Sequence, residues 1–177
     1  MVLKSKKVIA SVIAGLVALG GGYYMTQGAY DQGKVFEGYS ETAYPDVVYG
    51  WALPTICRGH TKGVYRGQVA TPEQCEQWYQ EDMAEGQVIM RAAIGDEIFD
   101  SLTQGEKEGY GMFAHNTGYF KTQRTGQPTS MYTRLMNGDR VGACKALLMY
   151  NRANGKVLNG LTTRRQFEYQ RCISELE

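Results

Sequence analysis

The composition and the secondary-structure signals of the chain change at Thr71, and this boundary constrains its fold more than any other feature. Residues 37–69 are rich in glycine, proline, tyrosine, threonine and valine, and they show no sustained helical period. Such a composition predicts a small antiparallel sheet with turns. The run Thr71-Pro72-Glu73-Gln74 then has the residues of a helix start, with Thr71 as N-cap, Pro72 in the first helical position and Gln74 completing a capping box.

Helical signals dominate the rest of the chain. Thr103 as N-cap, with Glu106 three residues later, predicts a helix that runs to about Ala114. We expect the fold class to be α+β and mostly helical, with a small antiparallel sheet lobe, a helical lobe and a cleft between them. One face of the first helix is predicted from residues at helical spacing: Cys75, Trp78, Tyr79 and Asp82. The other predicted segments are a polar joint at 27–35, helices at 129–136, 141–150 and 162–176, a turn at 137–139 and a Gly/Asn loop at 151–160.

The N-terminus has the pattern of an export signal. Lys4, Lys6 and Lys7 precede an uncharged, largely apolar run over residues 8–25, which fits a segment inserted with its N-terminus in the cytoplasm. The run is only about the minimum length for a bilayer span, and several glycines dilute its hydrophobicity. Three interpretations stay open: a cleaved signal peptide, a permanent anchor, and a marginal anchor that leaves the membrane when the membrane potential collapses. We expect an anchor segment at 1–26 and one folded domain at 27–177.

The four cysteines predict disulfides. An even number in a chain with an export-type N-terminus favours disulfide bonds over a metal site or buried free thiols. Proximity in sequence favours Cys57–Cys75 and Cys144–Cys172 among the three possible pairings. No CxxC pair occurs and the chain has only 2 histidines, so we expect no metal and no cofactor.

Charge and composition limit the classes of partner. The formal net charge is +1, which does not favour nucleic acid as a partner. The 13 tyrosines suit a sugar-binding cleft, although tyrosine is also common in protein cores and at their rims. No feature of the sequence predicts a dimer, so we expect a monomer.

Glu37, Asp46 and Thr55 are the candidate catalytic residues. Cleavage of a glycosidic bond needs a proton for the leaving oxygen and a nucleophile, usually water, at the anomeric carbon, and two carboxyl groups in different environments can divide this work. A Glu–x8–Asp spacing by itself is weak evidence, because such pairs arise by chance in most proteins. The residues around the pair carry more information.

Four segments occur together and in order along the chain: Glu37-Gly38, Ala43-Tyr44-Pro45-Asp46, Thr55-Ile56-Cys57-Arg58-Gly59-His60-Thr61 and Gly160-Leu161-Thr162-Thr163-Arg164-Arg165-Gln166-Phe167-Glu168. They resemble the bacteriophage-type lysozymes (glycoside hydrolase family 24), which implies a lysozyme-like fold. With the N-terminal segment, the whole chain resembles a signal-anchor-release endolysin of that family.

The resemblance implies a division of roles. Glu37 matches the general acid, expected on a short helix at the mouth of the cleft; Asp46 matches the carboxylate that positions or activates water. Thr55 matches the hydroxyl that helps to hold this water. The reaction would invert the anomeric centre, and the substrate would be peptidoglycan, cut between N-acetylmuramic acid and N-acetylglucosamine. Residues 47–54 form a longer stretch than the family normally has, which predicts a longer hairpin turn in which Trp51 lines the cleft or caps the hairpin.

The resemblance also bears on residues outside this set. It implies a structural His60 paired with Asp82 rather than a base, and it places a polar cleft residue at Asn116. Asn116 is also predicted to lie at the C-terminal end of a helix, before Gly118, and the two interpretations are compatible. Arg164 and Arg165 could contact the anionic wall polymer, but salt-bridged structural roles are favoured on a charged helix, and His115 is expected to be incidental.

These features together predict a phage endolysin. It would be exported in an inactive form tethered to the host inner membrane through residues 8–25, and activated in the periplasm on release. The alternatives are a permanently anchored cellular muramidase for wall remodelling or toxin use, a non-catalytic wall-binding module, and a lytic transglycosylase.

Overall fold

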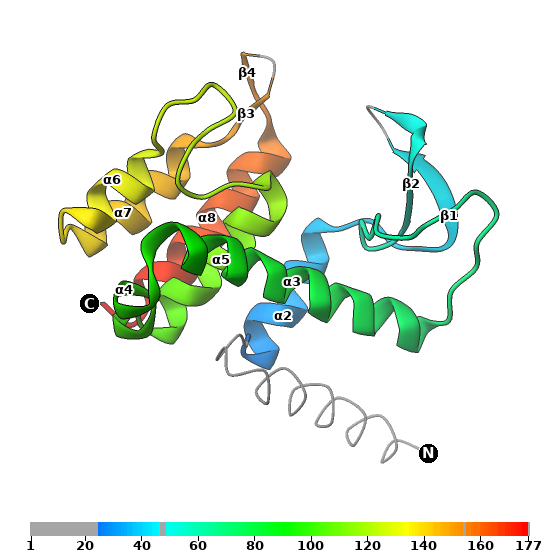
Figure 1. The fold of residues 1–177 in the computed structure, drawn as a ribbon, viewed down its shortest axis with the longest axis horizontal. Coiled ribbons are helices and arrows are strands. Elements are labelled where there is room, and N and C mark those ends of the chain that lie inside the picture. Colours follow the sequence, from blue (N-terminus) through cyan, green and yellow to red (C-terminus); the bar gives the residue numbers. More distant parts are fainter. Residues whose placement is uncertain (1–24, 47–48, 154, 177) are drawn as a thin grey trace. The chain divides into compact units, whose positions relative to one another are not determined.

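The computed structural model describes residues 25–46, 49–153 and 155–176, and Figure 1 shows its helices and strands in chain order. The predicted anchor over residues 8–25 lies outside the described residues, apart from Met25. Among the helices that the structure describes, none has the length and apolar character needed to cross a membrane.

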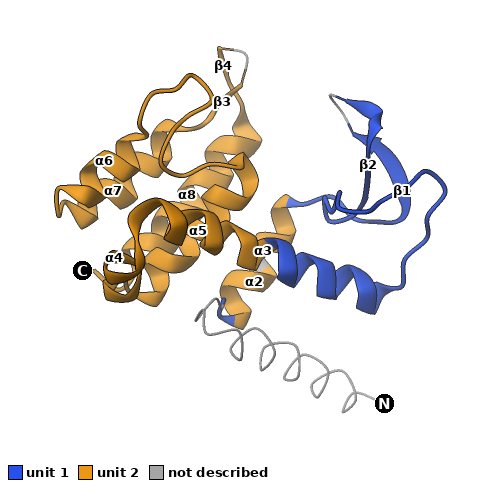
Figure 2. Ribbon diagram, viewed as in Figure 1, with its two compact units in different colours: residues 1–26, 37–82 blue, residues 27–36, 83–177 orange. Residues whose placement is uncertain are grey.

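The chain divides into two compact units (Figure 2). Unit 1 comprises residues 1–26 and 37–82, of which 25–26, 37–46 and 49–82 are described. Unit 2 comprises residues 27–36 and 83–177. Helix α3 (Pro72–Ile94) begins in unit 1 and ends in unit 2.

Unit 1 contains the predicted sheet, an antiparallel hairpin of β1 (Ser40–Asp46) and β2 (Gly50–Cys57). A third stretch of chain extends the sheet beside β1, because Ala43 N donates to Gln68 O at 2.9 Å and Ala70 N donates to Glu41 O at 2.8 Å. The hairpin register shifts near its tip, where Pro45 faces Pro54 but Asp46 faces Gly50. The longer turn expected from residues 47–54 is therefore accommodated by extra residues on the β2 side.

The core of unit 1 lies between the hairpin and the start of α3. Ala43, Ile56 and Ala70 are buried together with the Cys57–Cys75 disulfide, which joins the end of β2 to the first turn of α3. The predicted N-cap contact of Thr71 is present, since Gln74 N donates to Thr71 Oγ1 at 3.2 Å. The predicted helix face is also confirmed: Cys75, Tyr79 and Asp82 are buried, and Trp78 packs against the core.

Unit 2 is built around α5 (Gln104–Thr117), which starts with the predicted capping box between Thr103 and Glu106. Its C-terminal end is capped by Gly118 in the left-handed conformation, at φ 74°. Gly105 and Gly109 face the backbone of α8 (Asn159–Ile173), where a Cβ on either glycine would collide with a carbonyl oxygen. These two glycines therefore set the close approach of α5 and α8.

Several elements differ from the sequence-based expectations. The polar joint predicted at 27–35 is instead helix α2 (Gln27–Gly33) followed by the 3-10 helix η1 (Lys34–Phe36), because Ala29 and Tyr30 are buried. The loop predicted at 151–160 contains a short hairpin, and α8 begins earlier than the expected residue 162. The remaining elements of unit 2 are α4 (Asp96–Ser101), which was not predicted, α6 (Ser130–Met136), α7 (Arg140–Ala146), η2 (Leu147–Met149), β3 (Arg152–Ala153) and β4 (Lys156–Val157).

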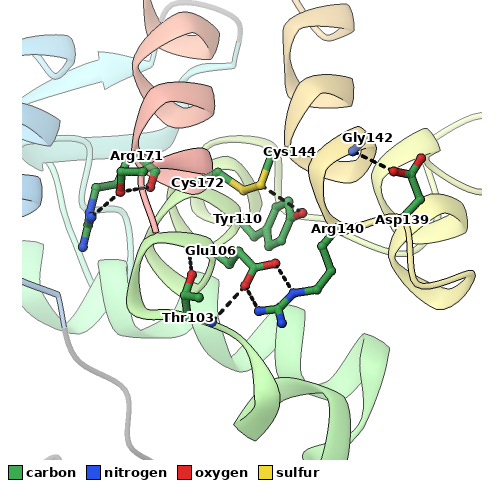
Figure 3. The surroundings of a disulfide bond; sticks show 10 residues. Thr103, Glu106, Tyr110, Asp139, Arg140, Gly142, Cys144, Arg171 and Cys172 are labelled. Carbon is green, nitrogen blue, oxygen red and sulfur yellow. Dashed lines mark hydrogen bonds and ion pairs between the residues drawn. A yellow bond between two sulfur atoms is a disulfide. The ribbon is translucent and has the colours of Figure 1, made fainter. Parts of the chain in front are cut away.

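Buried ion pairs and a second disulfide hold the helices of unit 2 together. Cys144 of α7 is bonded to Cys172 of α8, so both disulfides have the pairing that proximity in sequence favours. Three fully buried carboxylates each contact an arginine. The pairs are Glu106–Arg140 (Figure 3), Glu108–Arg171 and Glu168–Arg165. This pairing offsets the large cost of burying a charge.

Candidate active site

The hairpin of unit 1 carries three polar residues of interest. Tyr44 and Thr55 are directly opposed in the ladder, so their side chains share a face of the hairpin. Asp46 follows Tyr44 by two residues, across a register shift between Pro45 and Asp46. Two of the three predicted catalytic residues, Asp46 and Thr55, thus belong to one hairpin.

Asp46 is held by the turn that it begins. Its Oδ1 atom accepts a hydrogen bond from the backbone N–H of Tyr49 at 2.8 Å. This contact spans residues 47–48, which lie outside the described residues, and it fixes the carboxylate at the tip of the hairpin. An ionised carboxylate accepts such a bond well, which is compatible with the role predicted for Asp46.

Thr55 lies deeper in the hairpin. Its side chain is buried, and its Oγ1 donates to the carbonyl oxygen of Leu53 at 3.2 Å. A hydroxyl that donates in this way still has lone pairs with which to accept a hydrogen bond. The geometry is compatible with a hydroxyl that helps to hold a water molecule.

Glu37 reaches the other end of the hairpin. A Cβ atom built on Gly59 would lie 3.8 Å from Glu37 Oε2, so the carboxyl group lies over this glycine. Gly59 has φ +94° and belongs to a tight turn closed by two hydrogen bonds between Ile56 and His60, of 2.9 and 3.0 Å. The short helix expected to carry Glu37 ends one residue earlier, at Phe36, so the acid follows η1 instead of lying on it.

The charges of two carboxyl groups, Glu37 and Asp46, affect the pKa of Tyr44. Burial raises the pKa of the Tyr44 phenol, and the charges of Glu37 and then Asp46 raise it further. Both carboxyl groups therefore act on the same half-buried side chain. Within unit 1, the structure brings Glu37, Asp46 and Thr55 to the neighbourhood of Tyr44.

His60 has both ring nitrogens occupied. Its Nδ1 lies 2.9 Å from Asp82 Oδ2 and its Nε2 lies 3.0 Å from the carbonyl oxygen of Lys62. The imidazole also stacks on Trp78, with ring centroids 4.7 Å apart and planes at 3°. These contacts support the structural role expected for His60 and Asp82, since neither nitrogen is left to act on a substrate.

Trp51 lies in the extra residues near the tip of the hairpin. Its side chain is 39% exposed, and the guanidinium of Arg66 sits 4.8 Å from the centre of its ring system. A cation–π contact of this kind restrains the indole while leaving part of it open to solvent. Trp51 is thus available as a platform for a sugar ring, which keeps both interpretations of this residue open.

Asn116 lies in unit 2, one residue before the end of α5. Its Oδ1 atom accepts a hydrogen bond from Arg165, whose guanidinium also pairs with Glu168 and lies 4.7 Å from the centre of the Phe113 ring. Arg165 thus has the salt-bridged structural role that the sequence favours. The structure gives Asn116 a place at the helix end, and its role in binding substrate stays a prediction.

Arg164 differs from its neighbour. Its Nη2 atom donates to the carbonyl oxygen of Phe36 at 3.2 Å, and its guanidinium lies 5.5 Å from the centre of the Phe36 ring. The contact joins residues 128 positions apart in the chain, and Phe36 directly precedes Glu37. Arg164 therefore restrains the backbone that leads into the predicted acid.

Sequence reasoning assigned no role in this site to Tyr44 or Gly59, although both lie in the segments that carry the resemblance, and it did not single out Arg66. Tyr44 could have been found from the period of two along β1, since it precedes Asp46 by two residues. The positions of Gly59 and Arg66 depend on the fold of the loop after β2, for which the sequence carries no specific signal. Among the described residues, no group of three or more His, Cys, Asp and Glu side chains could hold a metal ion.

Comparisons with known proteins point to one family. Residues 34–168 match the family described as phage lysozyme. The chain is 34% identical over 169 residues to the SAR-endolysin of Pseudomonas phage phiKMV, covering 93% of this chain and 88% of that one. It is 29% identical over 140 residues to the SAR-endolysin of Enterobacteria phage PA-2, covering 77% of each chain.

Solved structures agree with the sequence comparison. The active form of the P1 phage endolysin Lyz matches with a TM-score of 0.74 at 21% identity, covering 96% of this chain and 95% of that one. The endolysin of Escherichia coli O157:H7 phage FAHEc1 matches with a TM-score of 0.66 at 27% identity, covering 86% of this chain and 95% of that one. The first likeness concerns the fold, and it extends over nearly the whole of both chains.

Proposed function

The chain belongs to the phage lysozyme family, and on that premise we propose that it is a phage endolysin. It is a lysozyme-type glycoside hydrolase that cuts the β-1,4 bond between N-acetylmuramic acid and N-acetylglucosamine in peptidoglycan. The observation that carries this proposal is the hairpin of unit 1, which carries Asp46 on β1 and Thr55 on β2, while the Glu37 carboxyl group lies over Gly59 in the turn after β2.

The proposed mechanism divides the work between the two carboxyl groups. Glu37 donates a proton to the leaving glycosidic oxygen, and Asp46 takes a proton from the attacking water, which Thr55 helps to hold. Water attacks the face opposite Glu37, so the anomeric configuration inverts without a covalent intermediate. Two features support this division: Asp46 is anchored through one carboxylate oxygen, and the Thr55 hydroxyl is fixed by a backbone carbonyl.

The decisive experiment is clearing of outer-membrane-permeabilised cells by the purified protein. Wild type should reduce the turbidity of the suspension, and Glu37→Gln should lose nearly all of this activity because the amide cannot donate the required proton. Glu41→Gln is the matched control: this carboxylate is exposed on β1 and accepts a hydrogen bond from Tyr39 at 2.9 Å. If Glu37→Gln clears cells as fast as wild type, Glu37 is not the acid.

Analysis of the products separates hydrolysis from a lytic transglycosylase reaction. Hydrolysis leaves reducing ends, whereas transglycosylation leaves anhydro-muramic ends. The expected result is reducing ends only, and the α-anomer formed first would support inversion.

Regulation by the membrane follows from the N-terminal run and from the relatives named SAR-endolysins. We infer that residues 8–25 hold the enzyme inactive at the host inner membrane, with the N-terminus in the cytoplasm, until the segment leaves the bilayer toward the periplasm. Exit carries three lysines and the terminal amine against the potential, a barrier of roughly 9 kcal/mol per 100 mV that depolarisation removes. Only a short stretch separates Met25 from Glu37, so tethering also holds the acid near the bilayer.

Membrane fractionation tests this regulation in cells that express the full chain. Before an uncoupler is added, the protein should be found in the membrane fraction without lysing the cells. After the uncoupler it should appear in the periplasm and become active. A protein that stays in the membrane after depolarisation would instead be the permanently anchored muramidase, while full activity in the membrane would contradict inhibition by tethering.

A further inference from the structure

Trp51 and Arg66 form an exposed pair on unit 1 that the proposed mechanism does not use. The Arg66 guanidinium lies 4.8 Å from the centre of the Trp51 ring system, and both residues are exposed to solvent. Trp51 belongs to β2, whereas Arg66 belongs to the loop between β2 and α3. The fold therefore brings an aromatic surface and a cation together from two separate segments.

The backbone around Arg66 is a closed turn. Gln68 N donates to the carbonyl oxygen of Tyr65 at 3.1 Å, and the Gln68 side chain accepts a hydrogen bond from Tyr65 N at 3.1 Å. Gly67, at φ +87°, takes the left-handed conformation that such a turn requires. Because Ala43 N donates to Gln68 O at 2.9 Å, the turn is fixed to β1. Arg66 is thus held beside the hairpin before any ligand binds, which lowers the entropy cost of binding.

The Arg66 guanidinium has binding capacity that the chain itself does not use. In the part of the chain that the structure describes, it pairs with no carboxylate and donates no hydrogen bond. By contrast Arg134, another exposed arginine, contacts Asp139 at 2.7 Å. A guanidinium has five N–H donors in a planar fork that matches a carboxylate. Arg66 is therefore available to a carboxylate of a ligand.

A peptidoglycan strand carries both groups that this pair can bind. Its sugar rings have apolar C–H faces, and an exposed indole offers a flat apolar surface to such a face. Its muramic acid residues bear stem peptides. The lactyl carboxyl group of the sugar is used in the amide bond to the peptide, so the free carboxylates of the strand belong to the peptide. Sugar and carboxylate are thus neighbours in the strand, as the indole and the guanidinium are in the protein.

We propose that Trp51 and Arg66 bind the peptidoglycan strand, with a sugar ring stacked on the indole and a stem-peptide carboxylate paired with the guanidinium. Arg66 thereby makes the enzyme prefer strands whose stem peptides carry free carboxylates. This inference rests on the proposed function, because it names the part of the proposed substrate that these two residues recognise.

The contact with the stem peptide is equally strong before and during the reaction. Cleavage of the glycosidic bond does not change the peptide, so its carboxylate has the same charge in the bound substrate and in the transition state. An interaction of this kind lowers KM and leaves kcat unchanged. Loss of the Arg66 charge is therefore expected to raise KM, whereas loss of the proposed acid Glu37 lowers kcat.

The test compares native soluble strands with strands whose stem-peptide carboxylates have been amidated, which removes the charge and keeps the size. Wild type should show a KM about 5- to 10-fold higher on amidated strands, between the effects of an exposed ion pair and of a charge-assisted hydrogen bond. Arg66→Gln should show this higher KM already on native strands, and amidation should then change it by less than about twofold. Arg66→Lys should recover part of the affinity, because it restores the charge without the planar fork.

Arg124→Gln is the matched control, because it removes one positive charge from an exposed arginine of unit 2. It should keep the wild-type KM on native strands and the wild-type response to amidation. An equal rise of KM in Arg124→Gln would show an effect of net charge alone and would overturn the inference. Trp51→Ala should raise KM on both kinds of strand, since the sugar contact does not depend on the carboxylate; an unchanged KM on amidated strands would overturn the stacking. The melting temperature is measured for each variant, and rates are expressed per folded molecule.

The outcomes separate this inference from the proposed function. If wild type releases reducing ends and Arg66→Gln responds to amidation as strongly as wild type does, only the role of Arg66 is contradicted. A wild-type preparation that releases no reducing ends from native strands contradicts the proposed function. Cosedimentation with native and amidated sacculi then still measures, without catalysis, whether Arg66→Gln has lost the preference for free carboxylates.

Discussion

Phe36, which directly precedes Glu37 in the chain, packs against Phe167 of α8 with ring centroids 5.7 Å apart. The Phe36 carbonyl oxygen also accepts a hydrogen bond from Arg164 at 3.2 Å. A helix near the C-terminus thereby fixes the segment that leads into the proposed acid. This segment thus depends on contacts formed by residues far away in the sequence.

Phe167→Ala should loosen this segment. The expected result is a lower kcat together with a loss of about 1–3 kcal/mol in the free energy of unfolding, less than for a fully buried phenylalanine. Gln166→Ala, at the exposed neighbouring position on α8, is the control and should change neither quantity. Activity assays and urea unfolding measure both effects; an unchanged kcat in Phe167→Ala would show that the contact serves stability alone.

The features that sequence reasoning predicted are those with local causes. The capping box at Thr103 and Glu106 depends on residues three apart, and the buried face of α3 depends on helical spacing. Helix α2 was missed because its polar, glycine-containing sequence has weak intrinsic helix propensity, and it is stabilised by burial of Ala29 and Tyr30.

The same distinction between local and tertiary causes applies to the residues of the candidate site. Glu37, Asp46 and Thr55 were predicted because their residue types and order carry a chemical meaning. Tyrosine is a common residue type in strands, so the identity of Tyr44 carries no chemical signal. Only the register of β1 against β2 places it opposite Thr55. The contact between Arg164 and Phe36 depends on tertiary packing that no local pattern encodes.

His60→Gln should reduce stability without removing catalysis. The substitution loses the stacking on Trp78 and weakens the contact with Asp82, which joins the loop after β2 to α3. We expect a loss of about 1–3 kcal/mol in the free energy of unfolding, as for a buried polar group left with a poorer partner. The measurement is kcat per folded molecule at a temperature well below the midpoint, and a complete loss there would point to a catalytic histidine.

Arg140→Gln should destabilise unit 2 strongly. The Glu106 side chain is fully buried and contacts both Arg140 and the backbone N–H of Thr103, so removal of the guanidinium leaves a buried carboxylate with too little compensation (Figure 3). The expected loss is about 2–4 kcal/mol, somewhat reduced because the Arg140 side chain is 35% exposed.

The matched control for this pair is Arg134→Gln, which breaks the exposed contact between Arg134 and Asp139 and should cost less than about 1 kcal/mol. The double variant Arg140→Gln/Glu106→Gln should recover part of the loss, because it no longer buries an uncompensated charge. Urea unfolding of the four proteins measures these differences. Equal losses in Arg140→Gln and Arg134→Gln would contradict the argument.

Tyr110 should make the protein sensitive to alkali. Burial raises the pKa of its phenol far above the usual value of 10.0, and its hydroxyl lies 3.5 Å from Cys144 Sγ. The folded state therefore keeps a proton that the unfolded state loses above about pH 10, so stability is complete below that pH and falls as the pH rises further. The slope from this residue is at most about 1.4 kcal/mol per pH unit. Urea unfolding between pH 8 and 11 should show a shallower decline of the free energy of unfolding for Tyr110→Phe than for wild type. Tyr49→Phe, at an exposed position, is the control and should follow wild type. Parallel curves for all three proteins would mean that Tyr110 ionises alike in the folded and unfolded states.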